Sequence, residues 1–130
     1  MLSFTNWSLI CGTWLVVDIC FLSLLPSSSM ASVSFWALLE IDKIGHLLFY
    51  GSASVFFALG SSHRRKRIVL LFSILVLGIV LECAQYAMHQ GRSFDLFDLM
   101  ANGLGVGLGS LVFVLIDRIW LKKNTGIGIQ

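Results

Sequence analysis

Residues 68–88 read IVLLFSILVLGIVLECAQYAM, an apolar stretch that carries a single charged residue, Glu82. As a helix rising about 1.5 Å per residue, it is long enough to cross roughly 30 Å of hydrocarbon. Three more largely apolar stretches occur at about 7–25, 42–60 and 94–120. The sequence therefore predicts an all-α fold, an integral membrane bundle of four transmembrane helices.

The overall composition agrees with a membrane protein and argues against other classes. Of the 130 residues, 57% are hydrophobic and 12% charged, with a mean hydropathy of +0.88. Soluble domains carry about 25% charged residues. The net charge of +2, without a stripe of basic and aromatic residues, argues against a nucleic-acid partner. The three cysteines lie inside apolar stretches, which favours reduced thiols. We expect a single domain over residues 1–130, with the lipid bilayer around it.

The first apolar stretch, residues 7–25, has a marginal length, so a signal peptide is the alternative interpretation. However, no Lys or Arg precedes it, and Asp18 interrupts what would be the apolar core of such a signal. We therefore predict a retained first helix. The segment from Pro26 to Glu40 is predicted to be a loop that lies partly in the membrane interface, where Trp is favoured.

The placement of basic residues predicts the orientation in the membrane. With four crossings, one side receives seven of the nine Lys and Arg residues: Arg64, Arg65, Lys66, Arg67, Arg118, Lys122 and Lys123. Only Lys43 and Arg92 fall on the other side. Because cytoplasmic loops are enriched in Lys and Arg, we predict that both termini are cytoplasmic. The links after the first and third helices then face outward.

Polar side chains recur at helical spacing on three of the predicted helices. The three sets are Asp42, His46 and Tyr50; Glu82, Gln85 and His89; and Asp95, Asp98 and Asn102. Each set shares one helix face near the predicted outer end, and Asp18 of the first helix lies at a similar depth. Ionisable groups in hydrocarbon are costly, so they turn inward and find partners. The pattern predicts a polar pocket that opens outward.

Structural roles are the alternative interpretation for several of these residues. Asp42 and Asp95 stand where a carboxylate can stabilise the exposed amides of a helix start. Lys43 and Arg92 can anchor at lipid headgroups, and His46 can form a buried pair with Asp42.

The positions of Glu82 and Asp98 favour a functional role, because these residues lie further from water or between large apolar residues. The candidate catalytic residues are therefore Glu82, Asp98 and His46. The candidate ligand-binding residues are Asp42, Lys43, His46, Glu82, Gln85, Arg92, Asp95, Asp98 and Asn102.

Three motifs occur in order along the chain: Asp42-Lys43-x-x-His46, Glu82-x-x-Gln85 and Arg92-x-x-Asp95-x-x-Asp98-x-x-x-Asn102-x-x-Gly105-x-x-x-Gly109. Together they cover about residues 42–109, and the chain resembles the VanZ-like family of bacterial membrane proteins. The resemblance implies a multi-pass protein of the bacterial plasma (inner) membrane that acts at the outer face, near cell-wall material. It also implies a possible link to resistance against the glycopeptide antibiotic teicoplanin.

Several functions agree with this pattern. The leading hypothesis is a site that binds a lipid headgroup or cell-envelope intermediate, with Lys43 and Arg92 contacting anionic oxygen. A membrane enzyme is the second, acting by acid–base chemistry or through Zn, Mn or Mg held by Asp42, His46, Glu82 and Asp98. No HExxH motif supports the metal version, so the sequence does not identify a cofactor.

Two other hypotheses are a small transporter, in which buried carboxylates and His relay protons, and an assembly partner of another membrane protein. The assembly-partner hypothesis rests on small residues that allow close approach of another helix: Gly103, Gly105, Gly107 and Gly109.

Overall fold

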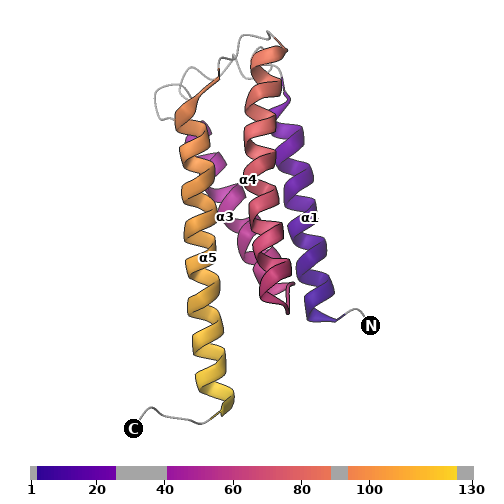
Figure 1. Ribbon diagram of the computed structural model, residues 1–130, viewed down its shortest axis with the longest axis vertical. Coiled ribbons are helices and arrows are strands. Elements are labelled where there is room, and N and C mark those ends of the chain that lie inside the picture. The colour runs from indigo at the N-terminus through magenta and orange to yellow at the C-terminus, as the bar shows by residue number, and fades with distance from the viewer. Residues whose placement is uncertain (1–2, 26–40, 89–93, 126–130) are drawn as a thin grey trace.

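The computed structural model describes residues 3–25, 41–88 and 94–125, without the side chains of residues 41–42 and 121–125. Within these residues four helices form the fold: α1 (Phe4–Ser23), α3 (Ile41–Leu59), α4 (Arg64–Ala87) and α5 (Leu96–Thr125) (Figure 1). The predicted all-α class with four helices is thus confirmed. The loop predicted at Pro26–Glu40 lies outside the described residues.

The helices differ from the predicted ranges most at the start of α4 and at the end of α5. α4 begins at Arg64 rather than near residue 68, because Arg and Lys are good helix formers and the basic run continues the helix. α5 begins at Leu96, since the preceding Asp95 caps it, and it continues to Thr125. The ends of α4 and α5 therefore include charged residues that the predicted ranges, which were based on apolar stretches, left out.

Three of the four helices are long and apolar enough to cross a membrane: Phe4–Ser23, Arg64–Ala87 and the Leu96–Trp120 part of α5. The apolar part of α3, Lys43–Leu59, is shorter. The outer surfaces agree with this assignment. Large apolar side chains such as Trp14, Phe72 and Ile119 are about two-thirds exposed, at 65%, 65% and 69%. Continuous apolar surface of this kind is suited to lipid rather than to water.

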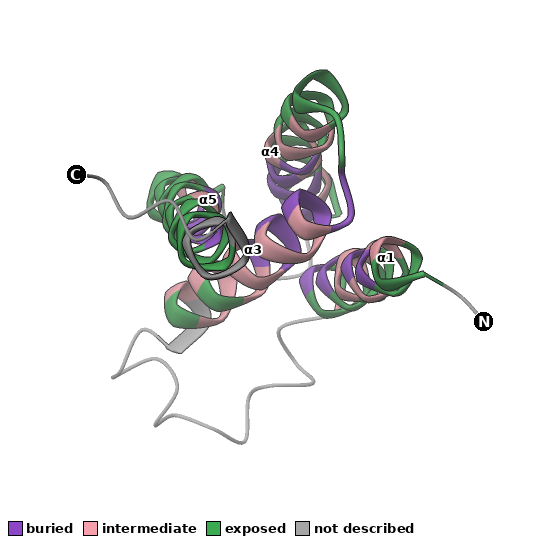
Figure 2. Ribbon diagram, turned by 90° about the horizontal axis from the view of Figure 1, so that it is seen from below, coloured by how far each residue is buried: buried purple, intermediate pink, exposed green. Residues whose placement is uncertain are grey.

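Consecutive helices run in opposite directions, so that α1 begins and α5 ends at the same end of the bundle (Figure 1). α3 crosses between the others and packs mainly against α5 and α1, and over a smaller area against α4 (Figure 2). Its buried residues Tyr50, Ala53 and Phe57 form the centre of the core. The other three helices are therefore held together chiefly through α3.

Glycines allow α3 and α5 to approach at backbone distance. A Cβ added at Gly105 would lie 2.5 Å from the carbonyl oxygen of Leu47, and one at Gly109 would overlap the carbonyl oxygen of Gly51. Gly103 and Gly107 differ, because a Cβ there would meet nothing within 4 Å. Two of the four glycines predicted for a partner helix are thus used inside this chain.

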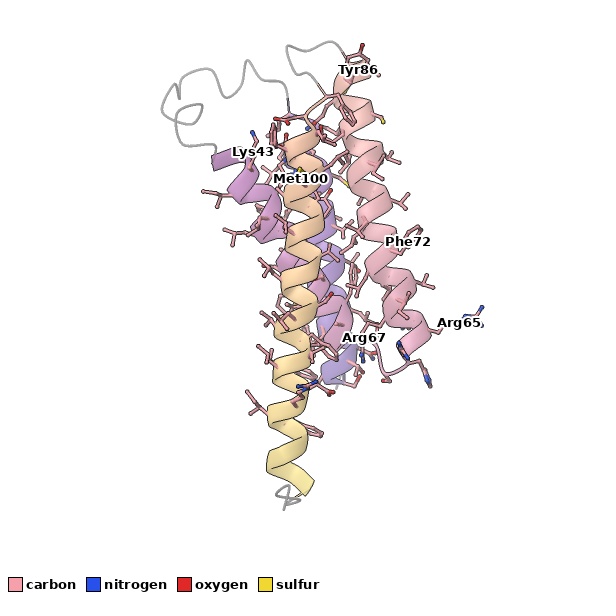
Figure 3. The ribbon with its side chains drawn as sticks, turned by 60° about the vertical axis from the view of Figure 1, so that its left-hand side comes forward. Lys43, Arg65, Arg67, Phe72, Tyr86 and Met100 are labelled. Carbon is pink, nitrogen blue, oxygen red and sulfur yellow. The ribbon has the colours of Figure 1, made fainter. Side chains whose placement is uncertain are left out.

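The two ends of the bundle carry different side chains. Figure 3 shows Lys43 and Tyr86 at one end, which we call the polar end, and Arg65 and Arg67 at the opposite, basic end. Arg67 also has a structural role, because its guanidinium lies 4.1 Å from the centre of the Phe113 ring and donates to the Ser61 carbonyl at 3.1 Å. The basic run thus helps to join α4 to α5.

The three cysteines, Cys11, Cys20 and Cys83, are free thiols, as the sequence predicted.

Candidate functional site

Three ionisable side chains from three helices meet near the polar end. His46 lies in the second turn of α3, Glu82 five residues before the end of α4, and Asp98 in the first turn of α5. Because α4 runs opposite to its neighbours, these positions reach the same depth. One ligand-type atom from each residue lies within 4.8 Å of the other two. Glu82 is only 1% exposed and Asp98 is 7% exposed.

Asn102 joins this group and orients the imidazole. The Nδ1–H of His46 donates to Oδ1 of Asn102 at 2.9 Å. Asn102 follows Asp98 by four residues, so both lie on the same face of α5. We call His46, Glu82, Asp98 and Asn102 the polar cluster. The donated Nδ1–H leaves the lone pair of the neutral ring on Nε2.

A glycine on α4 allows two polar side chains to pack closely against that helix beneath the polar cluster. A Cβ at Gly78 would lie 2.9 Å from the amide nitrogen of Asn102 and 3.1 Å from the hydroxyl of Tyr50. The Tyr50 ring stacks on the His46 ring, with centroids 6.2 Å apart. Among the described residues, neither that amide nitrogen nor that hydroxyl has a hydrogen-bond partner, although both are buried. Two donors therefore remain available at the base of the cluster.

Lys43 and Asp95 form a rim at the polar end, next to the polar cluster. Nζ of Lys43 lies 3.3 Å from Oδ2 of Asp95, and both side chains are about one-third exposed. The backbone N–H of Asp95 donates to Oε2 of Glu82 at 3.3 Å, which ties the start of α5 to α4.

Asp95 also caps α5. Its Oδ1 accepts the Phe97 backbone N–H at 2.8 Å, as expected for the residue before the first turn. This hydrogen bond, followed by the Lys43 ammonium, lowers the pKa of the Asp95 carboxyl below its ordinary value of 3.8. Asp95 therefore remains ionised over the neutral range, and the structural interpretation of this residue is supported.

Gln85 contacts α1 instead of the polar cluster. Its Nε2 donates to the backbone carbonyl of Ser23 at 2.7 Å, and both residues are buried. This bond satisfies a carbonyl in the last turn of α1, where helical partners run out. Gln85 is thus a contact between helices.

Replacing Gln85 with leucine should lower the free energy of unfolding by about 1–3 kcal/mol, because the buried hydrogen bond from the Gln85 amide to the Ser23 carbonyl would be lost. Thermal unfolding in detergent measures this change. Ligand or metal binding at the polar cluster should remain as in the wild type. A variant that unfolds normally but loses binding would show that Gln85 belongs to the site.

The structure brings some of the predicted residues together and separates others. The polar cluster contains four of them, Lys43 and Asp95 lie at its rim, and Gln85 is turned to α1. The Asp42 side chain and Arg92 lie outside the described residues. Asp18 does not share the predicted polar layer, because its side chain is exposed on the outer face of α1. α1 is apolar all round, so its sequence gave no signal for the direction of Asp18.

Sequence reasoning missed Gly78 as part of the site. The available signal was its spacing, because Gly78 precedes Glu82 by four residues and therefore lies on the same face of α4.

Among the described residues, the site holds two buried carboxylates and the Asp95 carboxylate, together with the Lys43 ammonium and an imidazole. Such a set can bind a cation, accept hydrogen bonds from hydroxyl or amino groups, or exchange protons with a bound molecule.

Apolar spanning helices and a buried polar cluster at one end define a multi-pass membrane protein. The profile of the VanZ/LLP1 family matches residues 2–117, and the chain belongs to this family. No curated protein and no solved structure matches the chain.

Proposed function

We propose that this protein binds the polar headgroup of a lipid or of a lipid-linked cell-envelope intermediate in the outer leaflet of the bacterial plasma membrane. The single observation that carries the proposal is the convergence of buried polar side chains from α3, α4 and α5 at one end of the bundle. Buried polar groups at membrane depth are expensive, and they mark binding sites more often than packing sites.

The orientation of the bundle supports an outward-facing site. The basic run Arg64–Arg67 lies at the end opposite to Lys43, and Lys and Arg are enriched on the cytoplasmic side. In this orientation both termini are cytoplasmic. α3 crosses as the fourth span, since about 17 residues is the lower limit for a transmembrane helix. The polar cluster then lies within roughly 10 Å of the outer helix ends.

The rim and the cluster have different roles in this proposal. Lys43 contacts an anionic oxygen such as a phosphate, and Arg92 is expected to join it. Glu82 and Asp98 accept hydrogen bonds from hydroxyl or amino groups deeper in the site, and the Asn102 amide nitrogen donates one. Support comes from the buried position of these three side chains and from the Asn102 amide nitrogen, which has no hydrogen-bond partner among the described residues.

The test compares lipid retention in two matched variants. Wild type, Asp98→Ala and Asp18→Ala are extracted from bacterial membranes in mild detergent, and phosphorus-containing lipid per chain is counted by native mass spectrometry. We expect the wild type and Asp18→Ala to retain it, because Asp18 faces away from the bundle. Asp98→Ala should retain at least tenfold less.

The same variants test a second part of the proposal, that the protein contributes to glycopeptide resistance through its action in the cell envelope. Expression of wild type or Asp18→Ala should raise the teicoplanin concentration that inhibits growth, and Asp98→Ala should not. Equal lipid retention and equal teicoplanin susceptibility in all three chains would contradict the proposed function.

A further inference from the structure

The geometry points to a second component of this site: we propose that His46, Glu82 and Asp98 bind one divalent cation of the Zn²⁺ or Mn²⁺ class. The cation would also bridge to an anionic oxygen of the ligand, and this bridging role rests on the proposed function. Metal binding itself does not depend on it.

The first argument is the number and spacing of the ligands. Three helices each supply one ligand atom, and the three atoms lie within 4.8 Å of one another. Ligands of a tetrahedral zinc ion at about 2.1 Å from the metal are roughly 3.4 Å apart, so small side-chain movements bring the set to bonding distance. Three protein ligands leave a fourth position for water or another oxygen, as in catalytic zinc sites.

The second argument is the support around these ligands. Metal-binding imidazoles donate their other ring N–H to a neighbouring oxygen. His46 does so through Nδ1 to Asn102, so Nε2 is the ring nitrogen that we assign to the cation. Oε2 of Glu82 accepts the Asp95 backbone N–H, and this bond fixes the carboxylate while Oε1 remains available. The cluster thus has the outer hydrogen bonds that orient metal ligands.

An independent observation concerns two buried donors beside these ligands. The Tyr50 hydroxyl and the Asn102 amide nitrogen belong to residues that are 1% and 2% exposed, and neither has a partner among the described residues. Tyr50 stacks on His46, and Asn102 is bonded to it. Donors in this position are suited to hold an oxygen, such as a water, that is bound to the cation.

The third argument is charge. Glu82 and Asp98 place two carboxylates at short distance in a buried site, where they repel each other and would also repel an anionic headgroup. A divalent cation removes both repulsions. Imidazole with two carboxylates is a donor set that suits Zn²⁺ and Mn²⁺. Cys83 is exposed and follows Glu82 directly, so it lies on another face and adds no thiolate.

The test titrates the purified full chain, stripped with EDTA, with Zn²⁺ alone and Mn²⁺ alone by calorimetry, and counts bound metal by elemental analysis. We expect about one equivalent of at least one of these ions in wild type and Asp18→Asn. Asp98→Asn and His46→Gln should each weaken binding at least 100-fold. Asn102→Ala removes no metal ligand, but it removes the bond that orients His46 and the amide donor beside the cation, so it should weaken binding about 10–100-fold. Circular dichroism verifies that each variant is folded.

Absence of stoichiometric Zn²⁺ and Mn²⁺ binding in the wild type would overturn the inference. Equal affinity of Asp98→Asn, His46→Gln and wild type would overturn it as well. Failure of the proposed function is a separate outcome. A chain that binds metal through this cluster but retains lipid equally in all variants supports the metal site and contradicts headgroup binding. If the chain binds no metal but its lipid retention depends on Asp98, headgroup binding is supported and the metal site is contradicted.

Discussion

Replacement of Gly109 by valine is expected to lower the free energy of unfolding by about 3 kcal/mol or more. A Cβ at this position would overlap the Gly51 carbonyl oxygen and the Ser54 hydroxyl oxygen, and it would lie 3.0 Å from the Gly51 carbonyl carbon. Two of these atoms are α3 backbone, which cannot rotate away as a side chain does. The contact between α3 and α5 would have to open, and α3 is the helix that the others share.

Gly107→Val is the matched control for this prediction. It introduces the same side chain into the same helix, where a Cβ meets nothing within 4 Å, so stability should change by less than about 0.5 kcal/mol. Reversible unfolding in mixed micelles measures both variants. Equal stability of Gly109→Val and Gly107→Val would show that α3 and α5 do not pack through this glycine. A large loss in Gly107→Val alone would instead indicate a partner helix at the exposed face.

These glycines show how far the sequence predicts packing. The spacing of Gly103 and Gly107 is the same as that of Gly105 and Gly109, so the motif alone cannot select one pair. The polar stripe on the same helix carries the missing information. Asp98 and Asn102 are buried, and Gly105 and Gly109 continue their stripe along the helix. A helix whose polar residues turn inward turns the glycines of that stripe inward too.

The site was predictable to the extent that helical spacing and alternating helix direction decide it. His46, Glu82 and Asp98 come together because each lies near the end of its own helix that faces the polar end. Contacts with backbone atoms were not predictable in this way. The Gln85 amide binds the Ser23 carbonyl, and every residue of α1 has such a carbonyl, so no residue type marks the partner. The prediction that Asp18 joins the polar layer was wrong for a related reason. α1 is apolar on all sides, so the sequence does not show which of its faces turns inward.

Glu82→Gln is expected to stabilise the metal-free protein while it abolishes cation binding. The Glu82 and Asp98 carboxylates have oxygens within 4.8 Å of each other, and two charges at that limit repel by about 3.5 kcal/mol at an effective dielectric constant of 20. Glutamine keeps the shape of the side chain and an oxygen that accepts the Asp95 N–H, but it removes one charge. The free energy of unfolding in EDTA should therefore rise by about 1–3 kcal/mol. Sites that were selected for binding rather than stability respond in this way.

Added metal gives the sharper test, because the order of stability of the wild type and Glu82→Gln should reverse between EDTA and Zn²⁺. At a free Zn²⁺ concentration of about 100 times the dissociation constant, the wild type gains roughly 2.7 kcal/mol, whereas Glu82→Gln gains nothing. Asp18→Asn loses one carboxylate charge at an exposed position, so it should gain as much from Zn²⁺ as the wild type. If Glu82→Gln instead lowers the stability in EDTA by more than about 1 kcal/mol, the Glu82 carboxylate is a packing element. The charge repulsion that we assign to the polar cluster would then be offset within the chain, and no cation would be needed to explain it.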